Sequence, residues 1–134
     1  MDDKVPIYDT VFMVDDDPIV NFVHQKIIGN IGIVNEIRSF IDPRKALAEL
    51  RSELCHAGKS ILVFLDLNMP KMSGFEFLEF MELEDFSLNV DVIVVTSSIC
   101  ENDRLLAELH PRFLRDFVTK PLKAEDLKKI VAYP

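Results

Sequence analysis

Four short stretches of this sequence end an apolar run with side chains that could bind a cation or transfer a group. They are "VDDDP" with Asp15 and Asp16, "VFLDLNMPKMSG" with Asp66, "VIVVTS" with Thr96, and "FVTKP" with Lys120. An apolar strand has no structural use for a carboxylate at its end. Asp66 is therefore either the first solvated residue of a turn or the residue that a strand presents to a site.

Carboxylates gathered in one place need compensation. Two of them about 4 Å apart repel by roughly 4 kcal/mol at an effective dielectric constant near 20, and without a partner one takes up a proton. A divalent cation removes the conflict, and oxygen ligands with room for water suit Mg²⁺ (or Mn²⁺) better than zinc. Lys120 adds a charge that can bind a phosphoryl oxygen, and Thr96 adds a hydroxyl. This combination predicts phosphoryl transfer to an aspartate.

The elements that must position these side chains alternate along the chain. Strands are predicted over residues 10–14, 33–40, 60–65, 90–95 and 112–118, and helices over 18–28, 42–54, 74–83 and 123–132. With a further helix between the last two strands, the pattern predicts an α/β doubly wound parallel sheet of five strands and five helices. Ligands of such sheets bind outside the carboxyl ends of the strands, so the four stretches should meet at one edge.

Length and charge limit the remaining possibilities. The 134 residues predict one domain spanning residues 1–134, with residues 1–9 as an acidic N-terminal tail. We expect no membrane insertion and a cytoplasmic location, because no apolar run reaches the roughly 20 residues of a membrane span and no signal peptide is recognisable. The net charge of −8 and the scattered basic residues argue against a nucleic-acid partner.

The four stretches, in this order at the ends of four strands, resemble the receiver domain of response regulators in two-component signalling, of the stand-alone chemotaxis-regulator type. The resemblance spans residues 11–121. It implies a flavodoxin-like sheet of strand order 2-1-3-4-5. It also implies a phosphoryl donor, either a sensor histidine kinase or a histidine phosphotransfer protein, and a downstream protein target.

The resemblance also assigns the acidic residues. Asp66 would be the phosphoacceptor and would share the metal with the two acids of the first stretch. Asp16 would ligate Mg²⁺ directly, and Asp15 would act mainly through water. The backbone carbonyl of Asn68 would complete the protein's ligands.

A second group of residues would transmit the signal. Lys120 would contact the acyl phosphate, and its bond to Pro121 is usually cis in similar proteins. Thr96 would move toward the phosphoryl group, and the aromatic switch position is Phe117, where many relatives carry tyrosine. The readout face would be the fourth helix, fifth strand and fifth helix, roughly residues 100–132. The modulating positions would be Asn68, Ser97 and Ser98.

Each of these residues also has a structural interpretation. Asp17 before Pro18 predicts the N-cap of the first helix, and capping is the alternative for the two acids before it. Thr96 could simply end a strand, Lys120 could be a solvated surface residue, and Phe117 could be a core residue. The three histidines, His24, His56 and His110, have no partner motif and are interpreted as structural.

Two other functions stay open. A phosphatase of the haloacid dehalogenase type also uses an aspartyl phosphate and Mg²⁺, but that family has an acid two residues after the nucleophile, where this chain has Asn68. A scaffold or adaptor could keep the receiver fold without being phosphorylated. The presence of all five reactive side chains, those of Asp15, Asp16, Asp66, Thr96 and Lys120, argues against that alternative.

Overall fold

Five parallel strands form one sheet in the order β2-β1-β3-β4-β5, which confirms the predicted α/β fold. The structure is a computed structural model that describes residues 8–32, 34–54, 60–84, 90–97, 105 and 113–132. The strands are β1 (Tyr8–Val14), β2 (Val34–Phe40), β3 (Ile61–Leu65), β4 (Val90–Thr96) and β5 (Leu114–Thr119).

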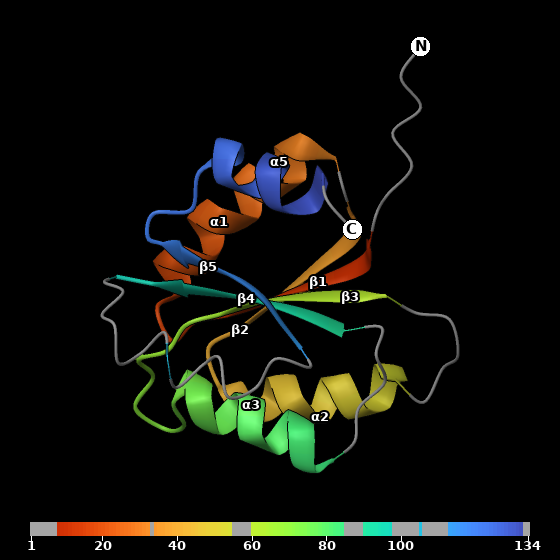
Figure 1. The fold of residues 1–134 in the computed structure, drawn as a ribbon, viewed down its shortest axis with the longest axis vertical. Helices are drawn as coiled ribbons and strands as arrows, with labels where there is room; N and C mark the ends of the chain where they lie inside the picture. The colour runs from red at the N-terminus through yellow and green to blue at the C-terminus, as the bar shows by residue number, and fades with distance from the viewer. Residues whose placement is uncertain are drawn as a thin grey trace.

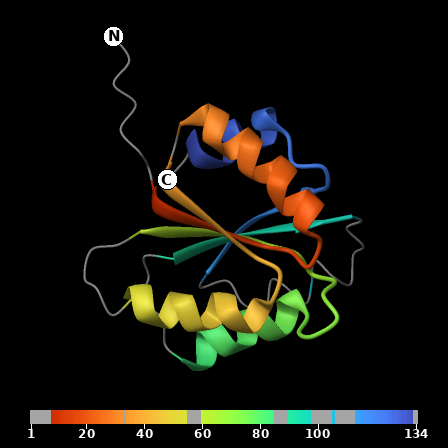
Figure 2. The ribbon, with the colours of Figure 1, turned by 180° about the vertical axis from the view of Figure 1, so that it is seen from behind.

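Helices cover both faces of this sheet. In Figures 1 and 2, α1 and α5 lie on one face, and α2 and α3 lie on the other. The bounds are α1 (Pro18–Ile31), α2 (Pro43–Leu54), α3 (Gly74–Leu83) and α5 (Ala124–Ala132). The helix predicted between β4 and β5 falls in a segment of which only Leu105 belongs to the described residues. Within the described ranges, no helix is both long enough and apolar enough to cross a membrane.

The element boundaries differ from the predicted ones mainly at the start of the chain. Strand β1 begins at Tyr8, so the prediction that residues 1–9 are a tail was wrong for Tyr8 and Asp9. Long-range contacts hold these two residues in the sheet. The hydroxyl of Tyr8 donates to Asp91 Oδ2 at 2.6 Å, and the carboxylate of Asp9 accepts the Ser60 N–H at 2.9 Å. At the other end of the sheet, β4 runs one residue further than predicted and includes Thr96.

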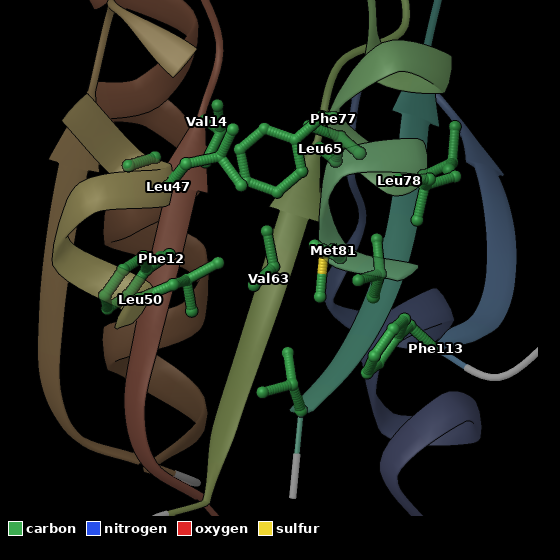
Figure 3. Close-up of a cluster of buried hydrophobic side chains, with 14 of the residues drawn as sticks. Phe12, Val14, Leu47, Leu50, Val63, Leu65, Phe77, Leu78, Met81 and Phe113 are labelled. Atoms are coloured by element: carbon green, nitrogen blue, oxygen red, sulfur yellow. The ribbon is translucent and has the colours of Figure 1, made fainter. Parts of the chain in front are cut away.

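Two apolar clusters hold the layers together. The apolar stretch of β3 is buried along its whole length, as expected for a central strand covered on both faces. The cluster under α2 and α3 gathers side chains from three strands and both helices, and Figure 3 shows Phe77 at the end where Val14 and Leu65 finish β1 and β3. The second cluster lies under α1 and α5. The apolar face predicted for the second helix is buried at Ala46, Leu47 and Leu50.

The strand register aligns the carboxyl ends that matter for function. Val14 pairs with Leu65, and Leu65 pairs with Val94 on its other side. The residues that follow these strands therefore begin at the same edge, as the parallel sheet predicts. Strand β5 reaches the same edge, because Thr119 pairs with Thr96.

Candidate functional site

The loop after β1 carries two acids with different surroundings. Asp15 is buried, with 5% of its surface exposed, and its N–H donates to the Phe40 carbonyl at 3.1 Å. Asp15 Oδ1 accepts the N–H of Asp17 at 2.9 Å, which turns the chain into α1. Asp16 is exposed. Asp17 is the N-cap of α1, as predicted, and its carboxylate accepts the Ile19 N–H at 2.9 Å.

The loop after β3 presents Asp66 beside the first acidic loop. Asp66 is also 5% exposed, and its N–H donates to the Val14 carbonyl at 3.0 Å. Its Oδ1 accepts the N–H of Asn68 at 3.3 Å. The loop then enters α3 through a capping box, in which the side chains of Ser73 and Glu76 each bind a backbone N–H of the other.

Lys120 joins the acidic residues from the far end of the chain. Its Nζ lies 2.6 Å from Asp15 Oδ2 and 3.5 Å from Asp66 Oδ1. Its N–H donates to the carbonyl of Thr96 at 2.7 Å, which fixes the end of β5 against the end of β4. The bond between Lys120 and Pro121 is cis, as the resemblance implied. Thr96 is fully buried behind this contact.

The acidic cluster has the composition of a site for a hard divalent cation. One carboxylate oxygen from each of Asp15, Asp16 and Asp66 lies within 4.8 Å of the others. Lys120 is the cation that contacts these acids among the described residues, and one ammonium cannot neutralise three carboxylates. Carboxylate oxygens are the ligands that Mg²⁺ prefers. The residues present therefore fit the metal that the sequence predicted.

Burial and the excess of negative charge in the cluster shift the pKa values of Asp66 and Lys120. The pKa of Asp66 is raised, because burial penalises its charged form and Asp15 repels it, and the effects of Lys120 and the Asn68 N–H only partly offset these. Burial alone would lower the pKa of Lys120. The hydrogen bond and the negative charge of Asp15, with a smaller effect of Asp66, outweigh burial and raise that pKa. The charged form is therefore more favourable for Lys120, and less favourable for Asp66, than for the same side chain in water.

The remaining predicted residues lie around this cluster or outside the described ranges. Asn68 is exposed and uses its N–H toward Asp66, so the metal-binding role of its carbonyl stays a prediction. Ser97 and Pro121 are exposed, and Ser98 lies outside the described residues. Phe117 is partly buried and packs against the cluster under α2 and α3. Both its core and its switch interpretation therefore stay open.

Sequence reasoning gave no functional role to three residues that touch the site or its loops, one of which, His24, it interpreted as structural. A Cβ on Gly74 would lie 2.7 Å from the carbonyl oxygen of Asp66, so α3 approaches the Asp66 loop too closely for any side chain. Asn21 and His24 are buried polar residues on α1. The order Ser-Gly before the third helix was a readable sign for Gly74, whereas nothing local in the sequence marks the other two. His56 and His110 lie outside the described residues.

We expect Gly74→Ala to destabilise the fold and displace Asp66. The added methyl group would meet backbone atoms of Asp66 and Leu67 at 2.7 and 2.9 Å, and neither can move without shifting the loop. Overpacking of this kind costs about 1–3 kcal/mol, which urea denaturation measures. Gly29→Ala is the matched control, because nothing lies within 4 Å of its Cβ and the helix gains about 0.5–1 kcal/mol from alanine. Equal stability of the two variants would contradict the close approach.

We expect Asp66→Asn to raise the free energy of unfolding at pH 7 when no divalent cation is present. An acid whose pKa is raised by folding stabilises the fold below its ordinary pKa of about 3.9, and loses that contribution as the pH rises through the folded-state pKa. The advantage of the variant should therefore shrink as the pH falls toward about 3.9. Denaturant titrations at several pH values measure it. A variant that is less stable than the wild type at pH 7 would contradict the unfavourable ionisation of Asp66.

Comparisons with known proteins agree with this geometry. A crystal structure of a two-component response regulator from Cytophaga hutchinsonii superposes with a TM-score of 0.78 at 30% identity, covering 93% of this chain and 95% of that one. The probable methanogenesis regulatory protein FilR2 of Methanothrix harundinacea (strain 6Ac) is 28% identical over 90% of this chain and 77% of its own length. The hybrid signal transduction histidine kinase L of Dictyostelium discoideum is 30% identical over 90% of this chain but only 7% of its own length.

The family comparison covers all of the loops described above. The family model for the response regulator receiver domain matches residues 11–132, from within β1 to the end of α5. This range includes the acidic cluster and Lys120. The chain therefore belongs to the response regulator receiver domain family of two-component signal transduction.

Proposed function

We propose that the protein is a phosphoacceptor module that receives a phosphoryl group on Asp66 and passes the signal on through protein contacts. The observation that carries this proposal is the contact of Lys120 Nζ with Asp66 Oδ1 at 3.5 Å inside a cluster of three carboxylates. A structural aspartate would not need a partly buried ammonium and two further acids beside it. A two-component receiver implies a histidine kinase as its partner, and which kinase or phosphotransfer protein serves this chain is part of the proposal.

The proposed transfer is a substitution at phosphorus. An Asp66 carboxylate oxygen attacks the phosphorus of a phosphohistidine, the P–N bond breaks, and its electron pair stays on the imidazole, which takes up a proton. Lys120 is placed to hold an oxygen of the transferred group, since it already contacts Asp66. Hydrolysis by water would return Asp66 and inorganic phosphate, so the signal would end without a second protein.

Asp15, Asp16 and Asp66 would hold the divalent cation, Mg²⁺ or Mn²⁺. When bound, it would neutralise negative charge on the transferred group and on the acids around it. The surroundings of the two neighbouring acids suit different roles. Asp16 is exposed and open to direct ligation, whereas Asp15 Oδ2 already contacts Lys120 at 2.6 Å. This difference supports the assignment of Asp15 to contact through water.

The output would start at Thr96 and Phe117. Phosphorylation adds charge and acceptor oxygens next to Lys120, whose backbone is bonded to the carbonyl of Thr96. Phe117 lies in the same pair of strands, opposite Val94, and is only partly buried. We propose β5 and α5, with the helix predicted between β4 and β5, as the readout face. A cytoplasmic location and the absence of a nucleic-acid partner remain predictions.

Exposed apolar residues beside the site suit the docking of the phosphohistidine donor. On α1, Ile19 is 72% exposed. Together with Val20, Val23 and Pro121 it lines a mostly apolar pocket of about 370 Å³ that also contains Lys120. The pocket therefore continues directly from the site. We propose that a donor protein covers this region when it brings its imidazole to Asp66.

We expect intact-mass spectrometry to detect one added phosphoryl group after incubation with Mg²⁺ and phosphoramidate. The adduct should need the metal and should be absent in Asp66→Asn, because that variant has no nucleophilic carboxylate. Asp17→Asn is the matched control and should be labelled normally, since Asn caps a helix as well as Asp does. If fast hydrolysis hides the adduct, binding of a stable phosphoryl mimic replaces it. Failure to bind that mimic would favour the scaffold alternative.

We expect Ile19→Gln to slow phosphorylation by a phosphohistidine protein that phosphorylates the wild type, without slowing phosphorylation by phosphoramidate. The substitution removes exposed apolar surface and adds no charge near the acids. Leu83→Gln is the control, because Leu83 is 79% exposed but belongs to α3 on the other face of the sheet. Rates come from radiolabel transfer. Equal slowing with both donors, or equal slowing by Leu83→Gln, would contradict docking on α1.

A further inference from the structure

Helix α1 buries two polar side chains where an apolar helix face would pack more simply. Asn21 is 3% exposed and His24 is 4% exposed. They are three residues apart and so lie on the same face of the helix, toward the sheet. Buried polar groups reduce stability unless they are hydrogen-bonded. The partners of these two side chains therefore indicate what the helix gains from them.

Asn21 binds the loop that carries Asp15 and Asp16. Its Nδ2 donates to the carbonyl of Asp15 at 2.9 Å and to the carbonyl of Phe40 at 3.3 Å. It thus ties the end of β1 to the end of β2. Its Oδ1 is buried and has no hydrogen-bond partner among the described residues. An unpaired buried acceptor is unfavourable. The stabilising contribution of this side chain therefore comes from the two hydrogen bonds that its Nδ2 donates.

His24 binds the loop that carries Lys120. Its Nε2 accepts the N–H of Leu122 at 3.3 Å, and Leu122 is a buried residue of the cluster under α1 and α5. This bond requires a neutral imidazole with its proton on Nδ1, a tautomer that we assign from the bond itself. Burial lowers the pKa of His24, and the charge of Lys120 acts in the same direction against the effect of Asp15. The neutral form is therefore favoured.

We propose that Asn21 and His24 are positioning residues that hold the acidic loop and the Lys120 loop at a fixed separation across α1. The inference rests on the proposed phosphoryl transfer at Asp66. The two loops come from β1 and β5, which are separated in the sheet by β3 and β4. A single rigid helix that binds a backbone group of each loop supplies the connection that the sheet order does not. The contact of Lys120 Nζ with Asp15 Oδ2 depends on that separation.

The two bonds go to different loops, so their loss should have different effects. Asn21→Ala should weaken Mg²⁺ binding by about 10–100-fold, the usual effect of losing a group that orients a ligand, as measured by isothermal titration calorimetry. His24→Leu should leave the dissociation constant of Mg²⁺ within about twofold and lower the rate of phosphorylation by phosphoramidate at saturating Mg²⁺ by at least about tenfold. His24→Gln offers an acceptor oxygen to Leu122 and should recover most of that rate.

Ile28→Ala is the control for lost stability. Ile28 is fully buried on the same helix and offers no polar group to either loop. At temperatures where all variants are folded, it should change neither Mg²⁺ binding nor the phosphorylation rate. The positioning roles are wrong if Ile28→Ala lowers Mg²⁺ binding and the phosphorylation rate as much as Asn21→Ala and His24→Leu do at equal loss of thermal stability. They are also wrong if Asn21→Ala and His24→Leu each lower both quantities equally.

Hydrogen exchange separates this inference from the proposed function. The Leu122 amide, followed by NMR, should exchange slowly in the wild type, faster in His24→Leu, and slowly again in His24→Gln. This result does not depend on phosphorylation. If the wild type takes up no phosphoryl group but the amide and Mg²⁺ results hold, the proposed function fails and the positioning roles stand. Unchanged exchange in His24→Leu would overturn the role of His24.

Discussion

The contact of Lys120 with Asp15 and Asp66 is the interaction on which the rest of this structure depends. Two buried carboxylates beside a third acid repel one another, and burial makes that repulsion stronger. The ammonium group reduces the repulsion but does not remove it, as the raised pKa of Asp66 indicates. The cluster therefore retains an affinity for positive charge. The parallel sheet makes this possible, because its register brings the ends of strands from distant parts of the chain to one edge.

Backbone hydrogen bonds to neighbouring strands hold the segments that carry Asp15, Asp66 and Lys120. The N–H of Asp66 is bonded to Val14, and the N–H of Lys120 is bonded to Thr96, so each reactive side chain starts from a backbone bonded to the neighbouring strand. The apolar clusters on the two faces of the sheet keep the strands from shifting. Such a rigid base is what an electrostatic site requires, because a misplacement of about 1 Å can cost a hundredfold in rate.

Much of this arrangement could be predicted from sequence because its signals are local. Apolar runs predicted the strands, and the polar residue after each run predicted the edge at which the site forms. Contacts between distant residues left no such signal. Tyr8 joins the sheet through Asp91, and His24 meets Leu122, in each case across most of the chain. Gly74 was visible as part of a turn, but its closeness to Asp66 depends on how α3 packs. The helix predicted before β5 stays a prediction.

The order of the site residues along the chain has a consequence for synthesis in the cell. Asp15 and Asp16 directly follow β1, Asp66 directly follows β3, and Lys120 directly follows β5. A nascent chain on the ribosome lacks the ammonium group of Lys120 until β5 and the residue after it have been synthesised, and until then Asp15 and Asp66 lack this ion-pair partner. Domains generally fold as units during synthesis. The proposed ability to accept a phosphoryl group would therefore be a property of the fully folded chain, and fragments that end before β5 would lack it.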